Sequence, residues 1–215
     1  DVIYYLTVYN EPMVQPAEPE NVDVEGILKG MYLLKEGSFE GVNPDARRVQ
    51  LLASGVGVPW ALEAQELLKR DYGVVADVWS VTSWTELRRE AMACDEHNFL
   101  HPEAERALPF VTRRLSGRPG PVVATSDYMR QVPDQIAQWV PARFVSLGAD
   151  GFGFSDTRAA ARRFFHIDGP SMAVRALQVL AEEGQLDWSI PREAAERYRL
   201  LDVTAGASGS AGGES

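Results

Sequence analysis

Hydrophobic residues occur along the chain in two alternating patterns. Short continuous runs rich in Val, Leu, Ile and aromatic residues are typical of buried strands, and between them apolar residues recur at helical spacing. Strands that alternate with helices favour right-handed crossovers. We therefore expect an α/β fold of three αβα layers, with helices on both faces of a mainly parallel sheet. The four predicted strands cover residues 49–54, 74–81, 121–125 and 143–147.

Glycine, proline and polar capping residues mark the expected ends of the helices. Pro59 suits the first turn of the helix that follows the first strand, and Gly73 suits its left-handed cap. Gly184 ends the longer helix that follows Gly169 and Pro170. Three further helices are expected: one started by Pro133 and running to Trp139, one capped by Asp156 and running to about Phe165, and one from Pro191 through Tyr198.

Residues 76–102 combine three features of a functional segment. A strand is followed by Ser83 and Glu86 at capping-box spacing, where the hydroxyl accepts an amide proton and the carboxylate reaches back. A helix follows from Thr85, and residues 97–102 are expected to form a polar loop. We therefore look for a site in this segment first.

Changes in composition predict four parts of the chain. Residues 1–20 hold a β-prone run and three prolines, typical of the last strand of a preceding domain and an extended connector. Residues 21–48 are expected to be a linker with a helix over 24–35. Residues 49–204 form the main domain, and residues 205–215, rich in Gly, Ala and Ser, are expected to be disordered.

The chain has 215 residues, a net charge of −10 and a single cysteine, Cys94. An acidic protein lacks the basic surface that nucleic acids and anionic membranes require, so we expect neither as a partner. The lone cysteine excludes an internal disulfide, and no apolar run approaches the length of a membrane span. These features favour a cytoplasmic protein.

Two patterns suggest chemistry without establishing it. Cys94, His97 and His101 have a spacing that could form part of a zinc site, although a structural site needs four ligands. The glycine-rich run over residues 148–156 invites a phosphate-cradle interpretation but lacks the P-loop lysine. We favour the simpler explanations, a hydrogen-bonded loop for the first pattern and a tight backbone turn for the second. The polar turns at the carboxyl ends of the strands leave a third possibility open, a stand-alone module that binds small anions.

Several longer motifs resemble one family. They are YYLTVYNE (4–11), EGILKGMY (25–32), DVWSVTSWTELRR (77–89), NFLHP (98–102), ATSDYM (124–129) and GADGFGFSDTR (148–158). In this order they resemble the carboxy-terminal part of the homodimeric bacterial pyruvate dehydrogenase decarboxylating component. The glycine-rich motif over residues 148–158 departs from the family at Ala149, where Thr is common, and at Phe154, where many relatives carry Arg.

The resemblance implies a domain like the carboxy-terminal domain of transketolase. The whole enzyme would use thiamine diphosphate and Mg²⁺ to decarboxylate pyruvate and would pass the acetyl group to the lipoyl domain of a dihydrolipoyl acetyltransferase. Its implied partners are its own amino-terminal and middle domains, a second subunit of the homodimer and that acetyltransferase. The cofactor motifs belong to the missing domains. We therefore expect no catalytic, cofactor or metal residues here, and an inactive fragment.

The remaining candidate residues are contacts with another domain or subunit. We assign this role to His97, Asn98, His101, Asp127 and Asp150. The same domain of another 2-oxo acid dehydrogenase or of a transketolase remains an alternative.

Overall fold

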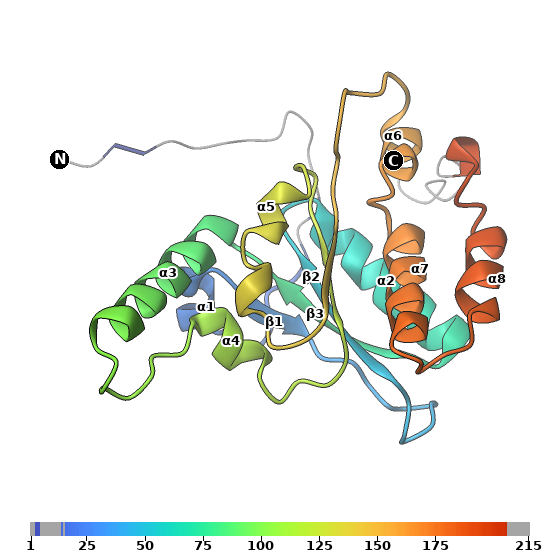
Figure 1. Ribbon diagram of the computed structural model, residues 1–215. Coiled ribbons are helices and arrows are strands. Elements are labelled where there is room, and N and C mark those ends of the chain that lie inside the picture. Colours follow the sequence, from blue (N-terminus) through green and yellow to red (C-terminus); the bar gives the residue numbers. More distant parts are fainter. Residues whose placement is uncertain (1–2, 5–13, 15, 206–215) are drawn as a thin grey trace.

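A computed structural model describes residues 3–4, 14 and 16–205. The strand expected near the start and the tail expected after residue 205 lie, almost entirely, outside these residues. The described chain forms a five-stranded sheet in the order β1-β3-β2-β4-β5 (Figure 1). Its strands are β1 (Tyr32–Lys35), β2 (Arg48–Ala53), β3 (Val75–Ser80), β4 (Val122–Thr125) and β5 (Phe144–Leu147).

The four predicted strands are confirmed as β2 to β5, and every pair among them is parallel. Their continuous apolar runs are explained by burial on both sides, because adjacent residues of a strand point to opposite faces. Leu51 and Val123 belong to one hydrophobic cluster, whereas their neighbours Leu52 and Val122 belong to the other. The predicted three-layer fold is therefore confirmed.

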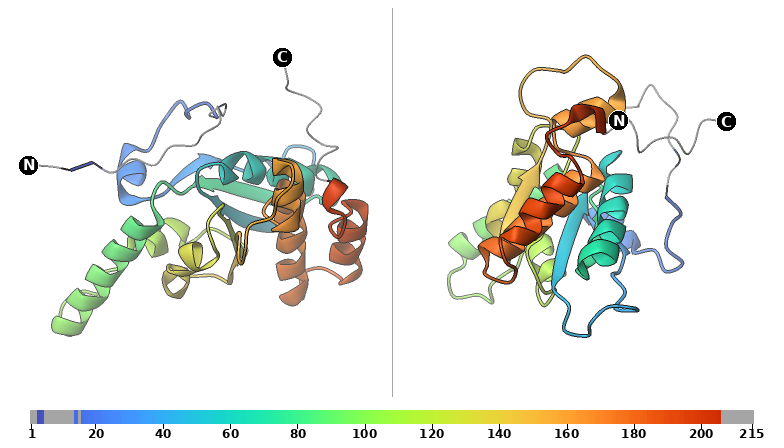
Figure 2. Two further views of the ribbon diagram at one scale, coloured as in Figure 1. Left: turned by 90° about the horizontal axis from the view of Figure 1, so that it is seen from above. Right: turned by 90° about the vertical axis from the view of Figure 1, so that its right-hand side faces the viewer.

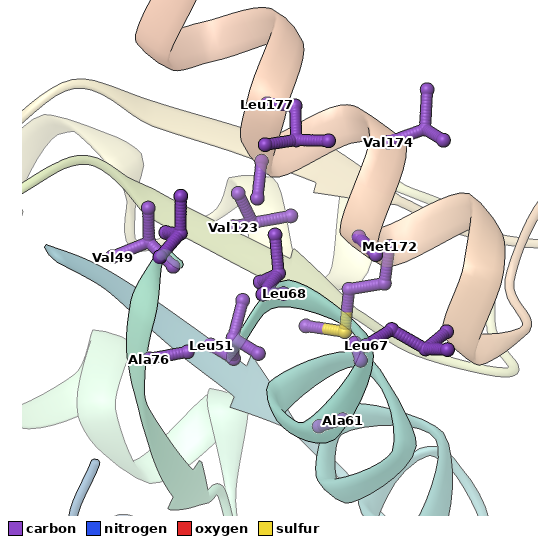
Figure 3. Packing of buried hydrophobic residues seen from close by; sticks show 14 of the residues in the cluster. Val49, Leu51, Ala61, Leu67, Leu68, Ala76, Val123, Met172, Val174 and Leu177 are labelled. Atoms are coloured by element: carbon purple, nitrogen blue, oxygen red, sulfur yellow. The ribbon is translucent and has the colours of Figure 1, made fainter. Parts of the chain in front are cut away.

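One face of the sheet is covered by α2 (Gly57–Tyr72), α7 (Gly169–Glu182) and α8 (Ser189–Arg197). Figure 3 shows Leu67 and Leu68 from α2 and Met172 and Leu177 from α7 gathered over the strands. Gly73 caps α2 with φ 61°, as predicted, and Gly184 follows α7 with φ 70°. This face holds the larger of the two clusters.

The other face carries α3 (Trp84–Leu100) and the short helix α4 (Phe110–Leu115), which together bury Trp84, Leu87 and Phe110. Figures 1 and 2 show α3 starting at the sheet and extending away from the rest of the molecule. The sequence did not predict α4. Its six residues are too few to show a helical period, and its Phe110 and Leu115 are fixed by packing against the sheet.

A strand replaces the second half of the helix expected over residues 24–35. α1 (Val24–Lys29) ends at Gly30, whose φ of 106° is left-handed, and a Cβ there would lie 2.6 Å from the Ser83 carbonyl oxygen. The chain then forms β1, which pairs antiparallel with β3. The sheet therefore extends into residues 21–48, which were expected to be a linker.

Three expected helix starts are also wrong by a few residues. Pro133 lies inside α5 (Gln131–Asp134), and a separate 3₁₀ turn, η1 (Ala137–Trp139), follows it. Thr157, not Asp156, caps α6 (Arg158–Phe164), because its hydroxyl accepts the Ala160 amide proton. α8 begins two residues before Pro191.

Candidate functional site

A pocket of about 620 Å³ lies at the carboxyl ends of three parallel strands. Its volume falls within the range of small-molecule sites, roughly 300–1,000 Å³. The polar turns that follow β2, β3 and β4 contribute to it. The lining residues are Ser54, Gly55, Ser80, Val81, Thr82, Ser83, Trp84, Thr85, Asp127, Tyr128 and Val132.

The order of the strands places this pocket where ligands bind in open α/β sheets. The chain leaves β2 toward α2 on one face, whereas it leaves β3 and β4 toward α3 and α5 near the other. Neighbouring strands whose connections diverge in this way leave a crevice beyond their carboxyl ends. The turn after β2 and the turn after β4 are further linked by Ser54 and Ser126, whose hydroxyl oxygens lie 3.5 Å apart.

The wall after β3 is held by α1 rather than by a complete capping box. Ser83 accepts the Glu86 amide proton, as predicted, at 3.1 Å. The carboxylate of Glu86 instead binds Arg89, while the Ser83 amide donates to the Gly30 carbonyl. Because Thr82 also donates to the Ile27 carbonyl, the entrance to α3 is fixed by the end of α1.

The pocket is polar and lacks positive side chains. Six of its described lining residues carry hydroxyl groups, one carries a carboxylate (Asp127), and none is Lys or Arg. A small anion or a diphosphate would therefore meet helix amides and hydroxyls but no cationic side chain, and it would face a carboxylate. These residues fit neither the small-anion hypothesis nor a thiamine diphosphate site.

Asp150 is engaged beside the pocket rather than inside it. Its carboxylate accepts the Arg130 amide proton at 2.9 Å and also binds the Arg130 guanidinium, which lowers the pKa of Asp150. Phe154 stacks on Phe164 with ring centroids 4.4 Å apart. Asp127 follows β4 and Asp150 follows β5, so both lie at the carboxyl edge of the sheet, as expected from their positions after predicted strands.

The other three candidates lie in a different region, at the far end of α3. The loop expected over residues 97–102 is largely helix, because α3 continues to Leu100 and His101 is its cap. Asn98 donates to the Ala107 carbonyl and accepts the Ala107 amide proton, which ties the returning chain to the helix. We call residues 92–108 the α3 arm; none of them is buried.

The exposed surface of the α3 arm includes large apolar side chains. Phe99 is 82% exposed and Leu100 is 59% exposed, and Met92 and Leu108 are also exposed. The arm also contains four carboxylates and one arginine. Large exposed apolar side chains are typical of a contact surface, so the arm agrees with the role expected for His97, Asn98 and His101 without testing it.

The described residues do not support the zinc hypothesis. His97 and His101 lie one helical turn apart, with ring centroids separated by 4.8 Å. Partial burial, reinforced by Glu90, raises the pKa of the Cys94 thiol and so disfavours the thiolate that zinc requires. Among the described residues, no three His, Cys, Asp or Glu side chains form a group that could hold a metal ion.

Comparison with known proteins gives a consistent result. Residues 30–168 match the family described as the transketolase-like TK C-terminal domain. The pyruvate dehydrogenase E1 component of Mycolicibacterium smegmatis is 53% identical over 205 residues, which are 95% of this chain and 22% of that protein. The E1 component of Escherichia coli strain K12 is 39% identical over 201 residues, 93% of this chain and 22% of that protein.

Solved structures with a similar arrangement include transketolases. The enzyme from Leishmania mexicana has a TM-score of 0.46 and 20% identity, over 77% of this chain and 20% of that chain. The enzyme from Campylobacter jejuni has a TM-score of 0.47 and 22% identity, over 75% of this chain and 20% of that chain. The present chain thus spans about a fifth of the length of the relatives it matches.

None of the described helices is long and apolar enough to cross a membrane.

Proposed function

Since the chain belongs to the family of transketolase-like TK C-terminal domains, we propose that it serves as the carboxy-terminal, non-catalytic domain of a pyruvate dehydrogenase decarboxylating enzyme. The observation that carries the proposal is the 53% identity to an E1 component over 95% of this chain but only 22% of the relative. The whole enzyme would decarboxylate pyruvate with thiamine diphosphate and Mg²⁺ in the cytoplasm and pass the acetyl group to the lipoyl arm of an acetyltransferase.

The contribution of this domain is a contact with the rest of the enzyme. The α3 arm projects about 13 Å beyond Ala91, the last buried residue of α3. Its exposed Phe99 and Leu100 lose contact with water only if another surface covers them. Because the arm contains four carboxylates and one arginine, we expect that surface to be apolar with a basic rim, on another domain of the same chain or on the second subunit. His97, Asn98 and His101 would lie in this contact, and Asp127 and Asp150 in a second one at the carboxyl edge.

The test compares the 215-residue chain with a longer chain that carries the amino-terminal and middle domains. We expect no binding of thiamine diphosphate and Mg²⁺ by the short chain in calorimetric titration, and acetyl transfer from pyruvate by the long one. Tight, stoichiometric cofactor binding by the short chain, or a long chain inactive toward pyruvate, would overturn the proposal.

Variants of the long chain test the arm. The double variant Phe99→Ser, Leu100→Ser should lower activity and weaken subunit or domain association, and His101→Ala should do so to a smaller degree. Leu201→Ser is the matched control, since Leu201 is 100% exposed and lies outside the arm. Equal effects of the control and the arm variants would contradict the assigned contact.

A further inference from the structure

The chain contains two Asp-Gly pairs, Asp150–Gly151 and Asp168–Gly169, which lie in different surroundings. The amide nitrogen of the glycine in such a pair can attack the carbonyl carbon of the aspartate side chain, because glycine has no Cβ to block the approach. The carboxyl hydroxyl leaves with the amide proton as water, and a succinimide ring forms. Water then opens the ring at either carbonyl, which yields aspartate or isoaspartate without a net change of mass.

The Asp168–Gly169 pair is held in place at the start of α7. Both residues are buried, and the Asp168 carboxylate binds the Arg163 guanidinium at 2.6 Å and accepts the Ser171 amide proton at 3.0 Å. The Gly169 amide donates to the Glu63 carboxylate. Because the amide is engaged and the backbone is packed, the glycine nitrogen cannot turn toward the preceding side chain, and we expect no reaction here.

The Asp150–Gly151 pair lies where the close contacts of its loop end. Just before it, the loop packs on the turn after β4, since a Cβ at Gly148 would lie 2.6 Å from the Arg130 backbone nitrogen. Gly151 itself is exposed with φ 87°, no described residue accepts a hydrogen bond from its amide, and Phe152 is 97% exposed. The Asp150 side chain is 43% exposed. Neither packing nor a hydrogen bond to a described residue therefore keeps the Gly151 nitrogen away from the aspartate side chain.

One residue restrains the reaction at this pair. The Arg130 amide donates to the Asp150 carboxylate at 2.9 Å, and the Arg130 guanidinium binds the same carboxylate. Attack proceeds through the protonated carboxyl group, because hydroxide leaves more readily than oxide. The hydrogen bond from the Arg130 side chain lowers the pKa of Asp150 and holds the carboxylate against the turn after β4. Both effects reduce the fraction of molecules that can react.

We propose that Asp150 is a site of spontaneous isomerisation to isoaspartate and that Arg130 restrains the reaction. The product carries one more carbon atom in its main chain, and its carboxylate is attached at a different carbon. It can no longer make both bonds to Arg130 in the present geometry, so isomerisation would loosen the turn after β5 from the turn after β4. The inference concerns the 215-residue chain and does not depend on the contact proposed for Asp150 in a longer enzyme.

The test is storage of the 215-residue chain at neutral pH and body temperature for several weeks. Isoaspartate is measured by enzymatic methylation of the protein, and peptide mapping with electron-transfer fragmentation locates it. We expect isoaspartate to accumulate at position 150 and not at position 168. Synthetic peptides covering residues 146–156 and 164–174 are the matched controls and should isomerise at similar rates, since the difference belongs to the fold. Equal isomerisation at the two positions of the folded chain, or none at position 150, overturns the proposal.

A variant tests the role of Arg130. Arg130→Gln removes the guanidinium and keeps the backbone amide, so isomerisation at Asp150 should accelerate by about two- to fivefold, the range expected for loss of an exposed ion pair. Arg89→Gln is the control, because Arg89 pairs with Glu86 on α3 and should leave the rate unchanged. Thermal unfolding verifies that both variants are folded. A folded Arg130→Gln protein that isomerises at the rate of the parent contradicts the restraint assigned to Arg130.

Discussion

The helices α7 and α3 are similar in length but differ in how the protein uses them. Ten of the 14 residues of α7 are buried, and they pack against α2, α8 and the sheet. Only three of the 17 residues of α3 are buried, and none lies beyond Ala91. The core of the domain thus packs against α7 along its whole length, but against α3 only along its first half.

A few hydrogen bonds, rather than burial, support the second half of α3. Isolated helices shorter than about 12–15 residues are marginal in water, so the second half of α3 needs support from residues outside the helix. Asn98 supplies two hydrogen bonds to Ala107, Asp95 accepts one from Trp139, and Glu90 accepts the Phe110 amide proton. Because the α3 arm exposes its apolar side chains and buries none, it suits contact with another protein surface better than a role in folding.

The largest expected effect lies in α7. Leu177→Ala should lower the free energy of unfolding by about 2–5 kcal/mol, because it leaves a cavity at a fully buried position. Denaturant unfolding of the 215-residue chain measures this loss. Leu201→Ala is the control and should change stability by less than about 0.5 kcal/mol. Equal losses of stability at the two positions would contradict the claim that burial of α7 stabilises the fold.

Asn98→Ala should have a smaller and local effect. Each of the two lost hydrogen bonds contributes about 1 kcal/mol, so amide exchange of residues 101–108 should accelerate by about tenfold or more. Global unfolding should change by less than about 0.5 kcal/mol, because the arm buries nothing in the core. A loss of global stability as large as that of Leu177→Ala would show that the arm belongs to the folding unit.

A third prediction concerns Asp71, near the end of α2, which binds residues at the end of α8. Hydrogen bonds from Arg70, and then from Tyr198, lower the pKa of Asp71 to about 2. A carboxyl group whose pKa is depressed in the folded state stabilises the protein above its unfolded pKa, and this stability is lost as pH falls through the folded pKa. Between about pH 4 and pH 2, Asp71→Asn should therefore flatten the loss of stability measured by denaturant unfolding. If the unfolding free energy of Asp71→Asn fell with pH as steeply as that of the parent, the stabilising role of the Asp71 carboxylate would be contradicted.

The smallest effect is expected for the tip of the α3 arm. Phe99→Ser should leave the unfolding free energy of the 215-residue chain unchanged within about 0.5 kcal/mol, because Phe99 is 82% exposed. Thermal and denaturant unfolding both measure it, and Phe110→Ser, at a position 3% exposed, is the matched buried control. A loss at Phe99 that approaches the loss at Phe110 would mean that the tip folds back onto the body.

The sequence predicted those elements whose cause is local or repeated. The four parallel strands, the glycine cap of α2 and the serine cap of α3 follow from runs and single residues that act on their own surroundings. β1 could not be predicted in this way, because Tyr32–Lys35 is a strand through its pairing with β3, more than 40 residues later in the chain. The polar side chains among residues 97–102 suggested a loop, although a projecting helix also exposes polar residues on most sides.

The candidate site was predictable only in outline. The polar turns at the carboxyl edge did converge, since parallel strands end together. Trp84 and Tyr128 were not predicted as lining residues, because their positions depend on how α1 fixes the entrance of α3 and how the turn after β4 folds. The five contact candidates fell into two separate regions, which no spacing along the chain revealed.

Native-state hydrogen exchange of the 215-residue chain tests the difference between α3 and α7 most directly. We expect the amides of α7 to exchange through global unfolding, and the amides of residues 92–100 to exchange through local opening at a clearly lower free energy. The first turns of α3, which contain the buried Trp84 and Leu87, should behave like α7. Equal protection along the whole of α3, at the level of α7, would contradict the account that the arm is held by a few hydrogen bonds rather than by burial in the core.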